Sequence, residues 1–141
     1  MQAGNYGEML LRVADRLCRE LGYAESGEVP GARTTPGEGL ATSRILDSED
    51  AALVARLRTA LAKIAVALNT RSEDAPVPGV LAALDGAEMV MRGELVSGNA
   101  GQLPRLMPSF VFLVALPIVE QDRALELSRR TSELIEEERA A

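Results

Sequence analysis

The chain has 141 residues, a formal net charge of −6 and an aromatic content of only 3%. Proteins that bind nucleic acid normally present a positive field to the phosphates, so the acidic charge argues against direct DNA binding. Histidine, the commonest general base and metal ligand, is absent, and no CxxC pair, P-loop or GxGxxG stretch occurs. We therefore expect a binding protein that needs no cofactor or metal, and not an enzyme.

The sequence also indicates a soluble protein of the cytoplasm. Cys18 is the only cysteine, so no internal disulfide can form. The N-terminus lacks the basic and apolar regions of a signal peptide. The longest apolar stretch, residues 106–119, is too short to span a bilayer and contains two prolines. We expect no association with a membrane.

The first predicted helix covers about residues 5–22. Its apolar residues Leu10, Val13 and Leu17 recur at helical spacing, and Gly22 stands where a C-terminal cap belongs. Residues 22–39 contain five glycines and two prolines, and their apolar residues show no helical or strand periodicity. This composition predicts a flexible loop, which a ligand or a partner could order.

The second helix is predicted to end near Asn69. A helical pattern begins near Leu40, breaks around Asp47 and resumes with Ser48 as the expected N-cap. Residues 71–78 are polar and end in prolines, which predicts a linker between helices.

Three helices are predicted in the remaining part of the chain. Residues 78–98 form an amphipathic helix, and residues 104–119 form one that is apolar nearly all round and therefore buried on most sides. Pro117 should bend or end it. Residues 122–139 are again amphipathic, and the acidic run 136–138 opposes the helix dipole, so we expect fraying there.

These elements predict an all-α fold of about five to six helices in an orthogonal or antiparallel bundle. The sequence contains no internal repeat, and residues 1–141 are expected to form one helical domain. Core positions would be filled by Leu, Val, Ala, Ile and Met, because aromatic residues are so few.

One face of the first helix carries Arg12, Arg16 and Arg19. These residues could contact phosphate, or they could form an exposed face balanced by nearby acids, which is the interpretation we favour. The balancing residues on the same helix would be Glu8, Asp15 and Glu20.

Two pairs of carboxylates lie one helical turn apart, Asp85 with Glu88 and Glu133 with Glu137. They could act as an acid and a base, but a solvated helix face is the favoured interpretation, since no second polar cluster accompanies them. Cys18 falls in the apolar stripe of the first helix, which favours a buried, inert thiol over a redox sensor.

The most hydrophobic third of the chain gathers Met89, Met91, Met107, Phe110 and Phe112. The spacing of these residues along the chain is consistent with packing in the core of a helical fold. Methionine also lines adaptable apolar pockets, so the sequence leaves a packed core and a ligand pocket both open.

Two amphipathic helices, residues 78–98 and 122–139, flank the predicted buried helix. They could present a seam to a second copy, forming a four-helix bundle across a two-fold axis. Gly86 and Gly93 lie seven residues apart on one helix face and would allow close approach of two backbones, or they merely weaken the helix.

The stretch LAALDGAEMVMRGEL, followed by a glycine-containing loop and by LMPSFVFLVALPIV with its late proline, resembles the C-terminal part of bacterial TetR-type transcriptional regulators. The resemblance spans Pro78 to Ala141. It implies a ligand-binding domain like the C-terminal domain of that family, which forms a homodimer through its last helices and takes a small hydrophobic ligand. The segment LLRVADRLCRELGY also resembles the first helix of the family's DNA-binding domain, but no second helix or recognition helix follows it.

On this hypothesis two sets of residues carry the function. The residues expected to line the ligand pocket are Leu84, Met91, Met107, Phe110 and Leu113. The residues expected at the dimer interface are Met89, Gly93, Leu127, Thr131 and Leu134. The alternative is a stand-alone adaptor or antitoxin-like module that binds protein through the loop 22–39 and the acidic tail. An enzyme that uses carboxylates alone is the weakest hypothesis.

Overall fold

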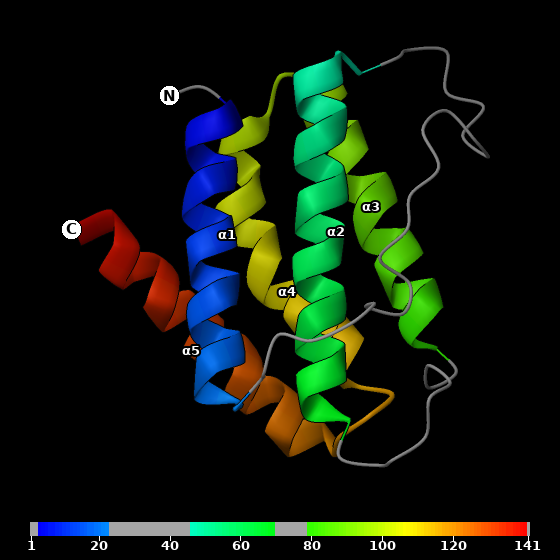
Figure 1. Ribbon diagram of the computed structural model, residues 1–141, viewed down its shortest axis with the longest axis vertical. Coiled ribbons are helices and arrows are strands. Elements are labelled where there is room, and N and C mark those ends of the chain that lie inside the picture. The colour runs from blue at the N-terminus through cyan, green and yellow to red at the C-terminus, as the bar shows by residue number, and fades with distance from the viewer. Residues whose placement is uncertain (1–2, 23–45, 70–78, 141) are drawn as a thin grey trace.

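The computed structural model describes residues 3–22, 46–69 and 79–140, which form five α-helices and one short 3-10 turn (Figure 1). The elements are α1 (Ala3–Glu20), α2 (Ser48–Leu68), α3 (Val80–Val96), η1 (Ala100–Gln102), α4 (Leu103–Ala115) and α5 (Gln121–Ala140). The described residues contain no strand, so the predicted all-α class is confirmed. Nearly all of the predicted loop 22–39 and the whole of the predicted linker 71–78 lie outside the described residues.

The helices form a bundle around α4. Figure 1 shows α1 and α2 side by side and running in the same direction, with α3 running back beside α2 and α5 crossing obliquely. α4 lies behind α1 and α2 and contacts each of the other four α-helices. The prediction that this segment is buried on most sides holds for the sides that face these four helices, but its outer side is exposed at Leu113 and Leu116.

The core is a single cluster of aliphatic side chains contributed by every α-helix. α1 supplies Leu10, Val13 and Leu17 at the predicted helical spacing, and all three are buried. Aromatic residues contribute little, since Phe110 is the one buried aromatic side chain among the described residues. A core of branched and unbranched aliphatic chains packs readily between helices, which explains how so few aromatics suffice.

Glycines end two of the helices as predicted. Gly22 after α1 and Gly98 after α3 have φ angles of 80° and 76°. This left-handed conformation is strained for residues with a Cβ, and it turns the chain away from the helix axis.

Two predicted helix boundaries need correction. The N-cap of α2 is Asp47 and not Ser48, which is the first helical residue; the Asp47 carboxylate accepts a hydrogen bond of 2.8 Å from the backbone N–H of Asp50. α4 ends at Ala115 and not near residue 119. Pro117 has no N–H to extend the ladder, and the N–H groups of Ile118 and Val119 both donate to the Ala115 carbonyl in a tight turn.

Candidate interaction surfaces

The predicted pocket residues do not form a surface site. Leu84, Met91, Met107 and Phe110 come together in the core, each no more than 4% exposed. Leu113 is separated from them, because it lies on the outer side of α4 and is 48% exposed. The structure therefore places four of these five side chains where they pack against neighbouring helices.

The predicted dimer residues divide between surface and interior. Met89 and Gly93 lie on the exposed side of α3. Leu127, Thr131 and Leu134 are buried inside the chain itself, and the Thr131 hydroxyl donates a 2.7 Å hydrogen bond to the Leu127 carbonyl. The apolar side of α5 is already covered by α4 and α1, so in this conformation these three residues offer no surface to a second copy.

The outer side of α3 carries an apolar strip, which we call the α3 face. Its members are Ala82, Gly86, Met89, Val90 and Gly93. Met89 is 61% exposed and Val90 is 42% exposed. A Cβ added at Gly86 or Gly93 would meet nothing within 4 Å, so the backbone is bare at both positions. The face combines projecting apolar side chains with two places where another backbone could approach closely.

An arginine from α2 reaches the other flank of α3. The Arg58 side chain is 7% exposed, and its Nη1 donates to the carboxylates of Asp85 at 2.7 Å and Glu88 at 3.1 Å. Arg92 donates to the second carboxylate oxygen of Glu88 at 3.1 Å. The predicted solvated face is therefore wrong for Glu88, which is buried and ion-paired.

The sequence carries a signal for this buried network. Arg58 follows Val54 by four residues and precedes Leu61 by three, and Glu88 follows Leu84 by four. Both charged residues thus occur in phase with an apolar stripe, on two consecutive helices. Opposite charges at such positions indicate a buried ion pair.

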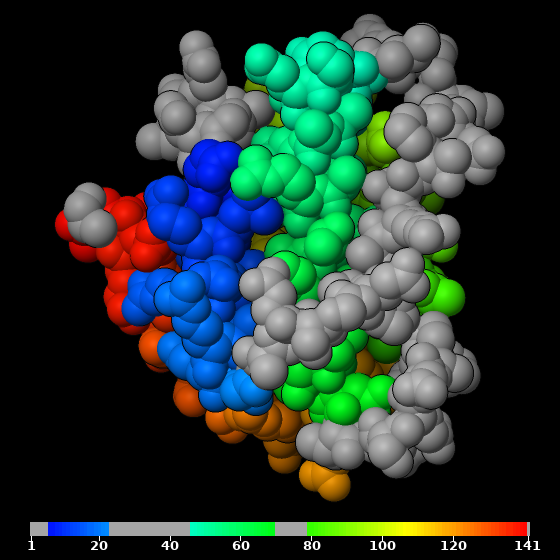
Figure 2. Space-filling view, viewed as in Figure 1, coloured from blue at the N-terminus to red at the C-terminus, as the bar shows by residue number. Residues whose placement is uncertain are grey.

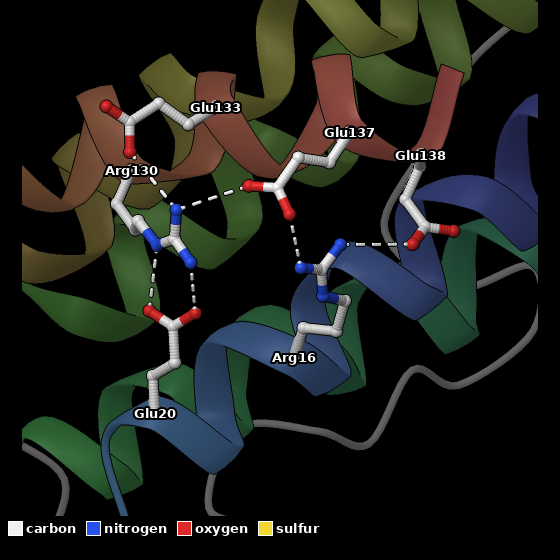
Figure 3. Close-up of polar contacts among 6 residues, drawn as sticks. All are labelled: Arg16, Glu20, Arg130, Glu133, Glu137 and Glu138. Atoms are coloured by element: carbon white, nitrogen blue, oxygen red, sulfur yellow. Dashed lines mark hydrogen bonds and ion pairs between the residues drawn. The ribbon is translucent and has the colours of Figure 1, made fainter. Parts of the chain in front are cut away.

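The chain's first and last helices are joined by ion pairs, which we call the α1–α5 clasp (Figure 3). Arg16 contacts Glu137 at 2.7 Å and Glu138 at 3.2 Å. Arg130 donates two hydrogen bonds, of 2.6 Å and 2.9 Å, to the carboxylate of Glu20. One more pair joins the two helices, Arg12 with Glu138 at 2.8 Å. Within α5, Arg130 also contacts Glu133 at 3.1 Å and Glu137 at 3.4 Å.

The clasp changes two of the predictions made for these charges. Arg12 and Arg16 are balanced by glutamates of α5, and only Arg19 pairs within α1, with Asp15 at 2.9 Å. The fraying predicted near residues 136–138 is also wrong, since α5 is helical to Ala140. Arginines from α1 neutralise the acidic run that would otherwise oppose the helix dipole.

The clasp lowers the pKa of three carboxylates. The pKa of Glu20 falls below its ordinary value of 4.5 mainly because it accepts hydrogen bonds from Arg130. The pKa of Glu137 falls because of its hydrogen bond from Arg16, and that of Glu138 because of its hydrogen bond from Arg12. Each guanidinium favours the charged form of the acid that it contacts.

α1 and α2 lie side by side on the face shown in Figure 2. Residues of both helices line a groove of about 520 Å³. We call it the α1–α2 groove. The described residues that line it are Leu11, Ala14, Asp15, Cys18, Arg19, Ala55, Arg56, Thr59, Ala60 and Lys63. None of the residues predicted to bind a ligand is among them.

Cys18 is buried, as predicted, at the edge of this groove. Burial in apolar surroundings raises the pKa of its thiol to about 11, and the negative charge of Asp15 adds to the increase. The thiolate is the reactive form of cysteine, so this environment keeps the side chain unreactive near neutral pH.

Other classes of site are absent from the part of the chain that the structure describes. No group of three or more acidic or cysteine side chains there could hold a metal ion. None of the helices in the same part combines the length and the apolar character needed to cross a membrane.

No family model, curated protein or solved structure matches this chain. The functional argument therefore depends on the residues and the geometry described above.

Proposed function

We propose that this chain is a cytoplasmic helical pairing domain, which associates with a second copy through the α3 face. The observation that carries the proposal is the exposure of Met89 and Val90 beside two glycines with open space in front of them. Exposed apolar groups gathered on one helix are typical of interaction surfaces.

The geometry of the α3 face suits a second copy of the same helix. Helices pack with their axes about 8–10 Å apart, and small residues allow the shorter of these distances. Met89 of each copy could then fill the space above Gly86 or Gly93 of the other, so one patch would complement itself across a two-fold axis. Asp85, at the edge of the face, is ion-paired with Arg58, which reduces its opposition to this contact.

The hypothesis of a TetR-like domain combines pairing with the sensing of a small hydrophobic ligand. Four of the five expected pocket residues fill the core, and a ligand in their midst would have to open close-packed helices. Pairing is consequently the part of the TetR-like proposal that the geometry supports best.

The test is the solution mass, measured by size-exclusion chromatography with light scattering. We expect a mass near twice the 15.0 kDa of the chain. Met89→Glu and Val90→Glu should each shift the protein to monomer, because a charge buried in an apolar interface is strongly unfavourable. Leu125→Glu is the matched control, since Leu125 is an exposed leucine on α5, away from the α3 face, and should leave the mass unchanged.

A wild-type monomer at high micromolar concentration would overturn the proposal and favour the adaptor hypothesis. A dimer that survives both substitutions on α3 would place the interface elsewhere.

A further inference from the structure

The outer side of α4 is exposed but apolar. Ser109, Leu113 and Leu116 recur every three or four residues, so they lie along one side of the helix. All three are exposed, Leu113 by 48% and Leu116 by 41%. Two half-buried side chains, Leu106 and Phe112, border them. We call these five residues the α4 strip.

The α4 strip lacks the charges that an exposed helix side normally carries. Residues 106–119 contain no charged residue. The exposed side of α5, by contrast, carries charges along its length, among them Arg123, Glu126, Arg129, Glu133 and Glu136. Helices at a protein surface turn charged and polar side chains to water, so an uncharged outer side indicates a surface that another molecule covers.

The α4 strip borders the α3 face. α3 packs against α2 on one flank, where Arg58 of α2 reaches Asp85 and Glu88. Its other flank, which carries Val90, turns to α4, the other α-helix that packs against it. α1 and α2 cover the front of α4 in Figure 1, so its outer side lies at the back, next to this flank of α3. The two surfaces therefore form one apolar patch across two helices.

The α3 face alone is too small for a stable pair. A specific protein–protein interface buries about 800 Å² on each partner, which corresponds to roughly 20 residues or more. The α3 face has five residues, and two of them are glycines. The α4 strip doubles this number and adds the large side chains of Leu106, Phe112, Leu113 and Leu116. A stable pair consequently needs both helices of each copy.

We propose that the α4 strip belongs to the same interface as the α3 face, so that α3 and α4 of one copy pack against α3 and α4 of a second copy as a four-helix bundle. The inference rests on the proposed pairing and extends it to α4. A second copy is the partner because the patch joins bare glycines to projecting side chains, which complement each other across a two-fold axis. Leu113 lies within this interface, whereas Leu125 on α5 stays outside it, among charged residues.

The first test measures the dissociation constant of the dimer by light scattering over a dilution series. Leu113→Glu should raise this constant at least about 100-fold, because pairing then buries a charge from each copy. Leu125→Glu is the matched control, since Leu125 is 51% exposed, and it should leave the constant unchanged. Circular dichroism melts at low protein concentration should be alike for both variants, because both side chains face solvent in the single chain.

A second test needs no charged substitution. Ser109→Cys places a thiol in the α4 strip, and Ser132→Cys places one on the exposed side of α5; each is combined with Cys18→Ala, which removes the only natural cysteine. Well above the dissociation constant, pairing should slow alkylation of the Ser109→Cys thiol about tenfold, because only the small unpaired fraction reacts. The Ser132→Cys thiol should react at the same rate at every protein concentration.

The outcomes separate this inference from the proposed pairing. A wild-type monomer overturns both, and leaves the patch to a partner of another kind. If Met89→Glu dissociates the dimer while Leu113→Glu does not and the Ser109→Cys thiol is unprotected, pairing stands and the inference about α4 is overturned. Equal protection of the two thiols, or a monomeric Leu125→Glu, also overturns it, because α5 would then belong to the interface.

Discussion

Two glycines within helices have opposite surroundings. A Cβ at Gly7 in α1 would overlap the side chain of Leu53, which is buried in α2, whereas a Cβ at Gly86 in α3 would meet nothing. We predict that Gly7→Ala lowers the free energy of unfolding by about 1–3 kcal/mol, because α1 and α2 must move apart or Leu53 must leave its rotamer.

Gly86→Ala is the matched control, and it should raise the free energy of unfolding by up to about 1 kcal/mol, because alanine favours the helix over glycine. Urea unfolding at low protein concentration, where pairing does not contribute, measures both. A stabilising Gly7→Ala would contradict the close approach of α1 and α2.

Arg58 holds the buried carboxylate of Glu88. We predict that Arg58→Leu lowers the free energy of unfolding by about 3 kcal/mol, because Glu88 then stays buried with its charge only partly compensated by Arg92. The double variant Arg58→Leu, Glu88→Leu should recover much of this loss, because two apolar side chains replace the buried pair. Chemical unfolding of the single and double variants measures both free energies of unfolding. A double variant no more stable than Arg58→Leu would show that the carboxylate is not the source of the cost.

At the scale of whole helices, the N-cap of α2 is Asp47, one residue before the Ser48 that the sequence predicted. We predict that Asp47→Ala lowers the free energy of unfolding by about 1 kcal/mol, because the backbone N–H of Asp50 loses its acceptor. Ser48→Ala should change it by only a few tenths of a kcal/mol, since Ser48 is the first helical residue and makes no cap. Thermal unfolding of the two variants, compared side by side, tests the assignment, and the reverse order would restore Ser48 as the cap.

Helical spacing predicted the five α-helices and the buried sides of α1, α2, α3 and α5. It could not predict which neighbour covers each side, because that choice depends on contacts between distant parts of the chain. The apolar stripe of α5 shows the difference: Leu127, Thr131 and Leu134 were predicted on one face correctly, but α1 and α4 cover that face within one chain. Their assignment to a dimer interface assumed that the face was free.

The candidate surfaces were predictable to different degrees for the same reason. Gly86 and Gly93 were predicted to share one helix face, which is a local property, and both lie on the exposed side of α3. The α1–α2 groove was not predicted, because it arises where short side chains of α2 meet α1. The partners of Arg12 and Arg16 were missed likewise, since their glutamates lie more than a hundred residues away along the chain.

For the whole molecule, the α1–α5 clasp makes stability depend on pH. The pKa values of Glu20, Glu137 and Glu138 are lower in the folded chain than the ordinary 4.5. Carboxylates shifted in this direction contribute stability that is fully present above their ordinary pKa and is lost as the pH falls through the folded values. We predict that the melting temperature is nearly constant from about pH 7 to pH 5 and falls below about pH 4.5.

Removing the arginine of a clasp pair should reduce this dependence. Arg16→Gln should melt below the wild type at neutral pH, and the difference should shrink towards about pH 3, where the glutamates are protonated in both proteins. About 1 M salt should shrink it too, because exposed charges are screened. Circular dichroism melts measure both effects. Arg105→Gln, an exposed arginine outside the clasp, should show no such convergence, and a difference for Arg16→Gln that is constant with pH would contradict the predicted role.

The contact between the first and last helices also has a consequence for how the chain folds. Arg12 and Glu138 are 126 positions apart, and α1 packs against α5 along one side of its apolar stripe. α2, α3 and α4 follow one another and touch in sequence order, so they can assemble from short loop closures. α1 is synthesised before α5, yet it reaches its full set of described neighbours only when α5 has emerged. We therefore expect the contact between α1 and α5 to form after the contact between α1 and α2, and the side of α1 that α5 covers to stay exposed until then.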